Sequence, residues 1–276
     1  MWVDSHCHLD SYDDLPQVLE NARAAQVERL LAIGIGDGPH EMHRALELAN
    51  QHAQILATAG IHPQEAHQAA PGALAKLREL AADPCCIAVG EIGLDYYHVD
   101  NPEIETQKAA FIAQMQIAAQ ARKLITIHCR TAELATPAAK AKFGPADAWE
   151  DLLALIAEHW MPTGLPGIMH CFSGNQQQAE RSLAAGFYLS FAGNVTYAKS
   201  AVIQAVARSA PADRILVETD APFLSPGALR GKRNEPANVA LTGEFVADLR
   251  GVSAADFARQ TTSNFYALFP SARDAA

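Results

Sequence analysis

Eight short apolar segments, each followed by a segment of helical periodicity, constrain the fold of this chain more than any other feature. The apolar segments occupy residues 1–10, 29–35, 55–61, 86–91, 124–128, 167–170, 187–191 and 214–218. They do not alternate cleanly between apolar and polar residues, which is typical of parallel strands buried on both faces. Eight strand–helix units close most simply into a (β/α)8 TIM barrel with its active site at the C-terminal face of the strands.

Periodicity predicts helices over residues 15–26, 41–52, 72–82, 103–122, 149–160, 176–185, 199–208, 237–250 and 254–269, and an irregular loop over 131–148. A chain of 276 residues has the usual size of one barrel, and no linker divides it, so we expect a single domain over 1–276. A doubly wound open sheet is the alternative. The absence of a G-x-G-x-x-G turn after the first strand weakens it.

Composition describes a globular protein, with 49% hydrophobic and 19% charged residues. No segment has the ~18 uncharged apolar residues of a membrane span, and no secretory signal is visible. The five scattered cysteines argue for a reducing cytoplasm. A net charge of −10 disfavours non-specific coating of duplex nucleic acid, but it permits one locally positive cleft.

Potential metal ligands gather at the predicted ends of several strands. His6 and His8 lie two positions apart on the first strand and therefore point the same way. Such a pair alone fits a ligand site and an accident equally well. Later strands end in further candidates, and the full set is His6, His8, His62, Glu91, His128, His170 and Asp220. Without His62, this set can hold two divalent ions that share a carboxylate and a bridging water.

Cysteines directly follow three of these histidines, at Cys7, Cys129 and Cys171. By alternation they point away from the barrel interior, so we expect packing residues rather than ligands. The site is then a mixed imidazole and carboxylate one, suited to Zn, Mn, Ni or Mg.

Seven motifs follow one another in an order that strongly resembles the TatD-type metal-dependent deoxyribonucleases of the amidohydrolase superfamily. They are DSHCHL at 4–9, GIHP at 60–63, GEIGLDY at 90–96, IHCR at 127–130, HCFSG at 170–174, ETDAP at 218–222 and RGKRNEP at 230–236. The resemblance implies a (β/α)8 barrel that hydrolyses phosphodiester bonds. It also implies one ion held by His6, His8 and Glu91 with Asp220 closing its shell, and another held by Glu91, His128 and His170. The loop at 131–148 is long for this family and could reshape the substrate cleft.

Two carboxylates are the expected catalytic groups. Asp220 would orient the nucleophilic water and accept its proton, and Glu91 would bridge the metals as a permanent carboxylate. The expected substrate-binding residues are His62, Arg130, Glu218, Lys232 and Asn234. Glu218, like Asp4 beside His6, could instead orient a ligand histidine by accepting its second N–H, or serve barrel packing alone.

Further residues near the strand ends could contact the substrate. The basic run at 230–234 could steer a polyanion, or it could be a solvated loop. The aromatic residues Tyr96, Phe172, Phe191 and Tyr197 could stack on bases, or pack in the core.

Three functions therefore compete. The first is exonucleolytic hydrolysis of DNA phosphodiester bonds at single-stranded ends by a metal-activated water. The second is hydrolysis of another ester or amide bond on the same scaffold, such as an aminoacyl-tRNA ester. The third is a non-catalytic metal-binding protein. For the first, we expect two divalent cations (Zn, Mg or Mn) and DNA or another phosphate-containing substrate. We expect no membrane and no obligate protein partner.

Overall fold

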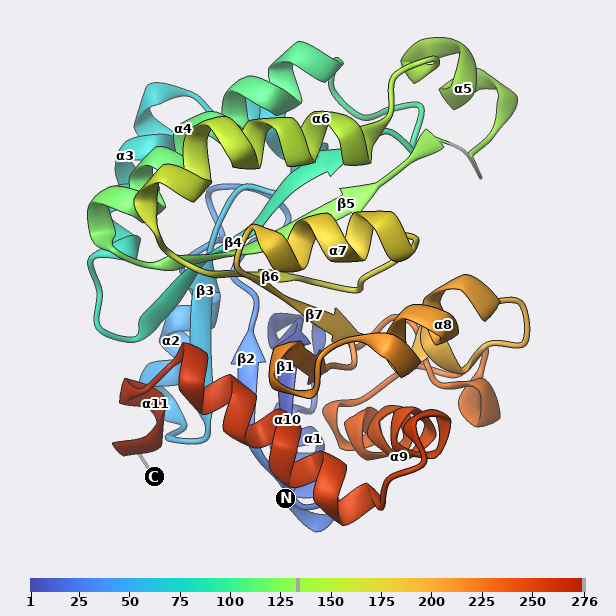
Figure 1. The fold of residues 1–276 in the computed structure, drawn as a ribbon. Coiled ribbons are helices and arrows are strands. Elements are labelled where there is room, and N and C mark those ends of the chain that lie inside the picture. The colour runs from blue at the N-terminus through green and yellow to red at the C-terminus, as the bar shows by residue number, and fades with distance from the viewer. Residues whose placement is uncertain (133–134, 275–276) are drawn as a thin grey trace.

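The computed structural model describes residues 1–132 and 135–274 of the chain. Eight parallel strands form one sheet in the sequential order β1 to β8, and they curve into a nearly closed barrel with helices outside it (Figure 1). The predicted TIM-barrel architecture is confirmed. The strands are β1 Trp2–Cys7, β2 Val27–Ala32, β3 Ile55–Ala59, β4 Cys86–Asp95, β5 Leu124–Arg130, β6 Gly167–Met169, β7 Phe187–Phe191 and β8 Ile215–Val217.

Apart from two short helices at 137–143 and 271–274, which the sequence periodicity did not predict, the helices begin close to their predicted starts. They are α1 Leu15–Ala24, α2 Arg44–Gln51, α3 Pro71–Ala81, α4 Ile104–Ala121, α5 Pro137–Phe143, α6 Ala148–Leu155, α7 Gln176–Ala184, α8 Ala201–Ser209, α9 Val239–Arg250, α10 Ala254–Leu268 and α11 Ser271–Asp274. Polar caps fix several starts. Asn175 and Gln178 form a reciprocal capping box at α7, for example, and Asp147 accepts two backbone N–H groups at α6. Within the described residues, no helix has the length and apolar character needed to cross a bilayer.

Backbone contacts between β1 and the segment after β8 close the barrel. Cys7 and Ala221 form a parallel bridge, and the His8 N–H donates to the Ala221 carbonyl at 2.8 Å. The Asp220 N–H donates to the His6 carbonyl at 2.9 Å. This closure brings the predicted ligands of the first and last strands together.

The barrel interior is apolar at the end where the strands begin. One core cluster takes side chains from all eight strands, among them Val3, Leu124 and Leu216, and seals them with Phe265 and Phe269 from the end of α10 and the residue after it. Polar side chains lie further along the strands, where Ser5 Oγ and Ser190 Oγ are 2.8 Å apart. The apolar floor therefore leaves the opposite end of the barrel for polar chemistry.

Strand β4 differs from the sequence prediction. It continues to Asp95, so Glu91 lies inside the strand rather than at its end. The pairing with β5 shifts between Val89 and Ile92, next to Gly90. A Cβ on Gly90 would lie 2.7 Å from the Thr126 carbonyl oxygen, so only glycine lets the two strands approach this closely.

The segment predicted as an irregular loop over 131–148 contains helix α5, although residues 133–134 lie outside the described part of the chain. Thr136 accepts the Ala139 N–H, and Pro137 occupies the first helical position. Phe143 then stacks on Tyr96 with ring centroids 5.6 Å apart. Cap and apolar contact together explain why a Pro- and Ala-rich segment is ordered here.

Asp4 does not accept a ring N–H of His6, which corrects one sequence expectation. Its carboxylate accepts the Thr219 N–H at 2.9 Å, lies 2.5 Å from the Thr219 hydroxyl, and accepts the backbone N–H of His6 at 3.3 Å. Asp4 is fully buried, and burial raises its pKa to about 8. The residue therefore fastens β1 to the segment after β8.

We expect Asp4→Ala to lower the free energy of unfolding by ~1–3 kcal/mol, because it leaves a buried N–H of Thr219 without a partner. Urea unfolding followed by circular dichroism measures this. An Asp4→Ala protein as stable as wild type would contradict the fastening role.

Asp4→Asn is the matched test for the ionisation of this carboxyl. Because its folded-state pKa is raised above 3.8, the stability that Asp4 contributes is fully present below pH 3.8 and lost as pH rises through about 8. Asparagine cannot ionise, so the unfolding free energy of Asp4→Asn should fall less with pH over this range than that of wild type.

Candidate metal centre

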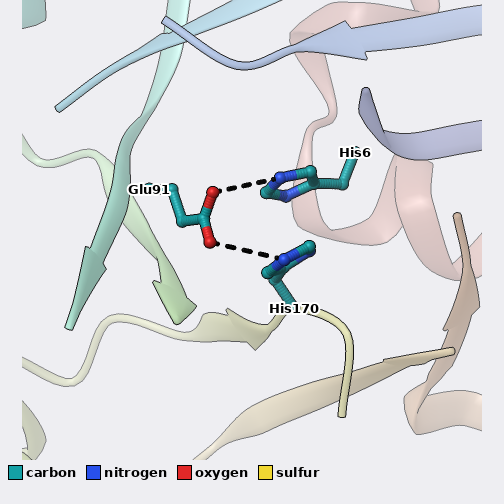
Figure 2. A group of neighbouring side chains, drawn as sticks. All are labelled: His6, Glu91 and His170. Carbon is teal, nitrogen blue, oxygen red and sulfur yellow. Dashed lines mark ion pairs between the residues drawn. The ribbon is translucent and has the colours of Figure 1, made fainter. Parts of the chain in front are cut away.

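Glu91 lies at the centre of a cluster of histidines and is only 3% exposed. One of its carboxylate oxygens, Oε2, lies 3.3 Å from His6 Nε2. The other, Oε1, lies 3.4 Å from His170 Nε2 and 2.8 Å from His128 Nδ1 (Figure 2 shows the His6 and His170 contacts). His62 Nε2 is 3.6 Å from the same oxygen. Four histidines from β1, β5 and the segments after β3 and β6 thus converge on one buried carboxylate.

Asp220 forms the second focus of the cluster. Its Oδ1 lies 3.3 Å from His8 Nε2, 3.7 Å from His6 Nε2 and 3.9 Å from His170 Nε2. The Asp220 backbone has φ 54°, in the left-handed region that non-glycine residues rarely adopt. Its side chain is 14% exposed, so this carboxylate borders the cluster at the side open to solvent.

The sequence prediction missed Asp95. Its Oδ2 lies 3.2 Å from His128 Nε2, and its Oδ1 accepts the Tyr97 N–H at 2.8 Å. His128 therefore bridges two carboxylates, Glu91 at Nδ1 and Asp95 at Nε2. The signal was present, because Asp95 lies four positions after Glu91 on one strand and alternation places both on the same face.

Glu218 contacts the ring nitrogen of His170 that does not face Glu91. Its Oε1 lies 2.7 Å from His170 Nδ1 and accepts the Cys171 N–H at 2.7 Å. The side chain of Glu218 is fully buried, so it does not face a substrate. This geometry fits the expectation that Glu218 orients a ligand histidine, and it does not fit the grouping of Glu218 with substrate-binding residues.

The charges of the cluster balance one another. Burial opposes ionisation of Glu91, but His170 and His6 outweigh it and hold the pKa of Glu91 well below its usual range. Burial also disfavours the cationic form of His170, yet Glu218 and Glu91 raise its pKa to about 10. Burial, together with the charge of His170, lowers the pKa of His6.

The donor set fits a divalent cation. Among the described residues, four groups have ligand atoms within 4.8 Å of one another: His6, Glu91 and His170; His6, His8 and Asp220; His62, Glu91 and His128; and His170, Cys171 and Glu218. His6 is completely buried, yet neither ring nitrogen has a hydrogen-bond partner among the described residues. Buried polar atoms rarely remain unpaired, so the free ring nitrogens of His6 indicate a metal ion as their partner.

The grouping differs in detail from the one that the family resemblance implies. The rings of His6 and His170 stack with centroids 3.4 Å apart, so these two ligands form one group with Glu91. His62, expected to bind substrate, lies close enough to Glu91 and His128 to be a ligand itself. Cys171 also lies within ligand distance of His170 and Glu218, although burial raises the pKa of its thiol well above the usual range.

The remaining predicted substrate residues lie around the cluster rather than in it. Arg130 is exposed at the end of β5, with its guanidinium 3.7 Å from the centroid of the Tyr97 ring. Lys232 is exposed on the loop after β8. Asn234 is fully buried and donates to the carbonyls of Thr219 and Phe223, so it braces this loop and is not accessible to a substrate.

Three of the four aromatic candidates lie in the core. Tyr96, Phe172 and Phe191 are at most 1% exposed and pack against other buried rings, and only Tyr197 is half-buried. Of the cysteines, Cys7 is fully buried as expected, whereas Cys129 and Cys171 are half-buried.

Comparison with known proteins assigns the family. The family model described as TatD related DNase matches residues 3–270. The chain belongs to the TatD family. This TatD-family chain is 37% identical over 272 residues to YabD of Bacillus subtilis, named as an uncharacterized metal-dependent hydrolase, with 98% of this chain and 99% of YabD covered.

Two further relatives cover almost the whole TatD-family chain. A protein of Erwinia tasmaniensis named 3'-5' ssDNA/RNA exonuclease TatD is 33% identical over 262 residues, covering 93% of each chain. The crystal structure of YjjV, a TatD homolog from Escherichia coli K12, superposes with a TM-score of 0.84 at 26% identity, covering 97% of each chain.

We expect Glu218→Gln to weaken metal binding by ~10–100-fold, because a glutamine cannot fix His170 as an ionised carboxylate does. Titration against a chromophoric chelator measures this. Glu158→Gln is the control, because that side chain is 73% exposed and its carboxylate contacts only the half-buried His159, at 3.8 Å, among the ion pairs of the described residues. Equal affinities in all three proteins would show that Glu218 serves packing alone.

Proposed function

We propose that this protein is a metal-dependent phosphodiesterase that hydrolyses DNA from single-stranded ends. The observation that carries the proposal is the buried His–Glu–Asp cluster opening onto a rim of exposed cationic side chains. Arg130 ends β5 at this rim, and Arg230, Lys232 and Arg233 lie on the loop that follows Asp220. The exonuclease name of the Erwinia relative supports the same substrate class.

We further propose two divalent cations, Zn, Mg or Mn, as the cofactor. Glu91 offers its two oxygens to different histidines, Oε2 to His6 and Oε1 to His128, His170 and His62, which is an arrangement suited to a bridging carboxylate. Asp220 lies beside His8 and His6 at the solvent side. When bound, the ions supply Lewis-acid activation of water and of the scissile phosphate.

The chain's own groups then orient the reactants. Asp220 is a carboxylate at the mouth of the cluster, suited to orient the attacking water and accept its proton. Arg130 can hold a phosphate through its bidentate fork, and the Tyr97 face and His98 Nε2, 3.3 Å away, fix that guanidinium in advance.

Because all five cysteines are unpaired, we propose that the enzyme works in a reducing cytoplasm.

We expect Asp220→Asn to lower kcat on single-stranded DNA by ~10²–10⁴-fold, because an amide cannot accept the proton of the nucleophile. Circular dichroism should show an unchanged fold. Asp213→Asn is the control, since that side chain is 70% exposed in the turn before β8. Wild-type turnover in Asp220→Asn would remove Asp220 from the mechanism.

Chelation tests the metal requirement. We expect EDTA-treated protein to lose its metal, measured by elemental analysis, together with its activity, and Mg, Mn or Zn to restore both. The panel should hold single-stranded DNA, duplex DNA, RNA and a simple carboxylic ester. Activity that survives complete metal removal would contradict the mechanism, and cleavage of the carboxylic ester alone would contradict the substrate class.

A further inference from the structure

Phe223 is an exposed aromatic side chain beside the candidate metal centre. The chain has ten phenylalanines, and the other nine are buried or half-buried, whereas Phe223 is 58% exposed. A single exposed apolar residue needs no explanation by itself. Phe223, however, lies three residues after Asp220, and hydrogen bonds hold its backbone in place. Both features indicate a role for the exposed ring.

The backbone of Phe223 is fixed on both sides. Its N–H donates to the Asp220 carbonyl at 2.8 Å, and its carbonyl accepts the Asn234 side-chain amide at 2.7 Å. Leu224 follows with φ 51°, in the left-handed region that bends the chain sharply. Its carbonyl packs so closely on Gly193 that a Cβ there would lie 2.0 Å away. The ring is therefore displayed on a rigid turn.

The ring also contacts the cluster directly. The Phe223 and His8 rings meet edge to face, with centroids 5.9 Å apart and planes at 71°. His8 Nε2 in turn lies 3.3 Å from Asp220 Oδ1. A group stacked on Phe223 would therefore lie beside the part of the candidate metal centre that His8 and Asp220 form.

Cationic side chains flank the same turn. Asn234, which holds the Phe223 carbonyl, also has its own N–H bonded to the Pro222 carbonyl at 3.1 Å, so the basic segment 230–233 is tied to the turn. Arg233 lies over the Tyr12 ring at 4.5 Å. A polyanion drawn to this segment meets an apolar ring next to the metal centre. Anionic backbone with flat π-faces is the chemistry of a single-stranded nucleic acid.

We propose that Phe223 is the stacking platform for the nucleobase of the nucleotide whose phosphate lies at the metal centre. This inference rests on the proposed phosphodiesterase function and names the feature that selects nucleic-acid ends with an unstacked base. A base paired within a duplex keeps its faces covered by its neighbours, so this platform favours single strands over duplex ends.

The test compares two oligonucleotides of one sequence, one normal and one with abasic residues at both terminal positions. On the normal strand, we expect Phe223→Ala to lower kcat/KM by about tenfold and Phe223→Trp to retain wild-type activity. On the abasic strand, wild type should fall to the level of Phe223→Ala, which should lose nothing further. Val202→Ala is the matched control, because Val202 is also 58% exposed but lies on α8.

A second readout separates this inference from the proposed function. A strand with terminal 2-aminopurine should lose fluorescence on binding metal-loaded Asp220→Asn protein, and the added Phe223→Ala substitution should abolish that quenching. If wild type cleaves no oligonucleotide, the proposed function is wrong, and the quenching alone decides the role of Phe223. Equal losses of activity on normal and abasic strands, or quenching that persists without the ring, would overturn the platform.

Discussion

A carboxylate buried in a protein interior must be compensated by nearby positive charge, by hydrogen bonds or by a metal, because its desolvation costs several kcal/mol. Glu91 has this position here, with four histidine nitrogens within 3.6 Å of its two oxygens. Each histidine comes from a different strand or strand end. The compensation therefore requires the barrel to close in one register, and the contacts of Asp4 on β1 with Thr219 in the segment after β8 maintain that register.

The convergence of the candidate ligands could be predicted from the sequence because it depends on strand order and not on exact strand boundaries. The C-terminal ends of parallel strands meet at one face, so His6, His128 and His170 converge even though several predicted boundaries are off by a few residues. The residues behind the ligands could not be predicted in this way. Glu218 and Asp4 each lie two positions before a ligand, yet only Glu218 reaches an imidazole. The difference depends on the irregular pairing of β1 between Asp4 and Cys7, which no sequence pattern reveals.

The sequence also could not predict which aromatic residues at the strand ends are exposed and which are buried. Tyr96 directly follows β4, but Phe143 of α5 stacks on it and removes it from solvent. Phe223 has no comparable cover and keeps more than half of its surface exposed. Whether a ring at a strand end packs or is displayed depends on the loop that lies over it. Here the deciding segment was itself predicted to be irregular, whereas the structure shows a helix held by its cap at Thr136, by the contact of Phe143 with Tyr96 and by the hydrogen bond from Lys142 to the Asn101 carbonyl.

One end of the barrel is a packed apolar floor, and the other end carries the candidate metal centre. The exposed positive charges of Arg130 and the 230–233 segment lie at the second end. Phe265 and Phe269 fill the end of the barrel where the strands begin, so side-chain packing alone closes that end. At the opposite end, exposed cations border the cluster although the whole chain carries −10. Exposed charges further apart than the Debye length of about 8 Å at physiological salt are largely screened from one another. A phosphate at the rim therefore responds to Arg130 and the 230–233 segment rather than to the net charge, which is how an acidic protein can attract a polyanion at one place.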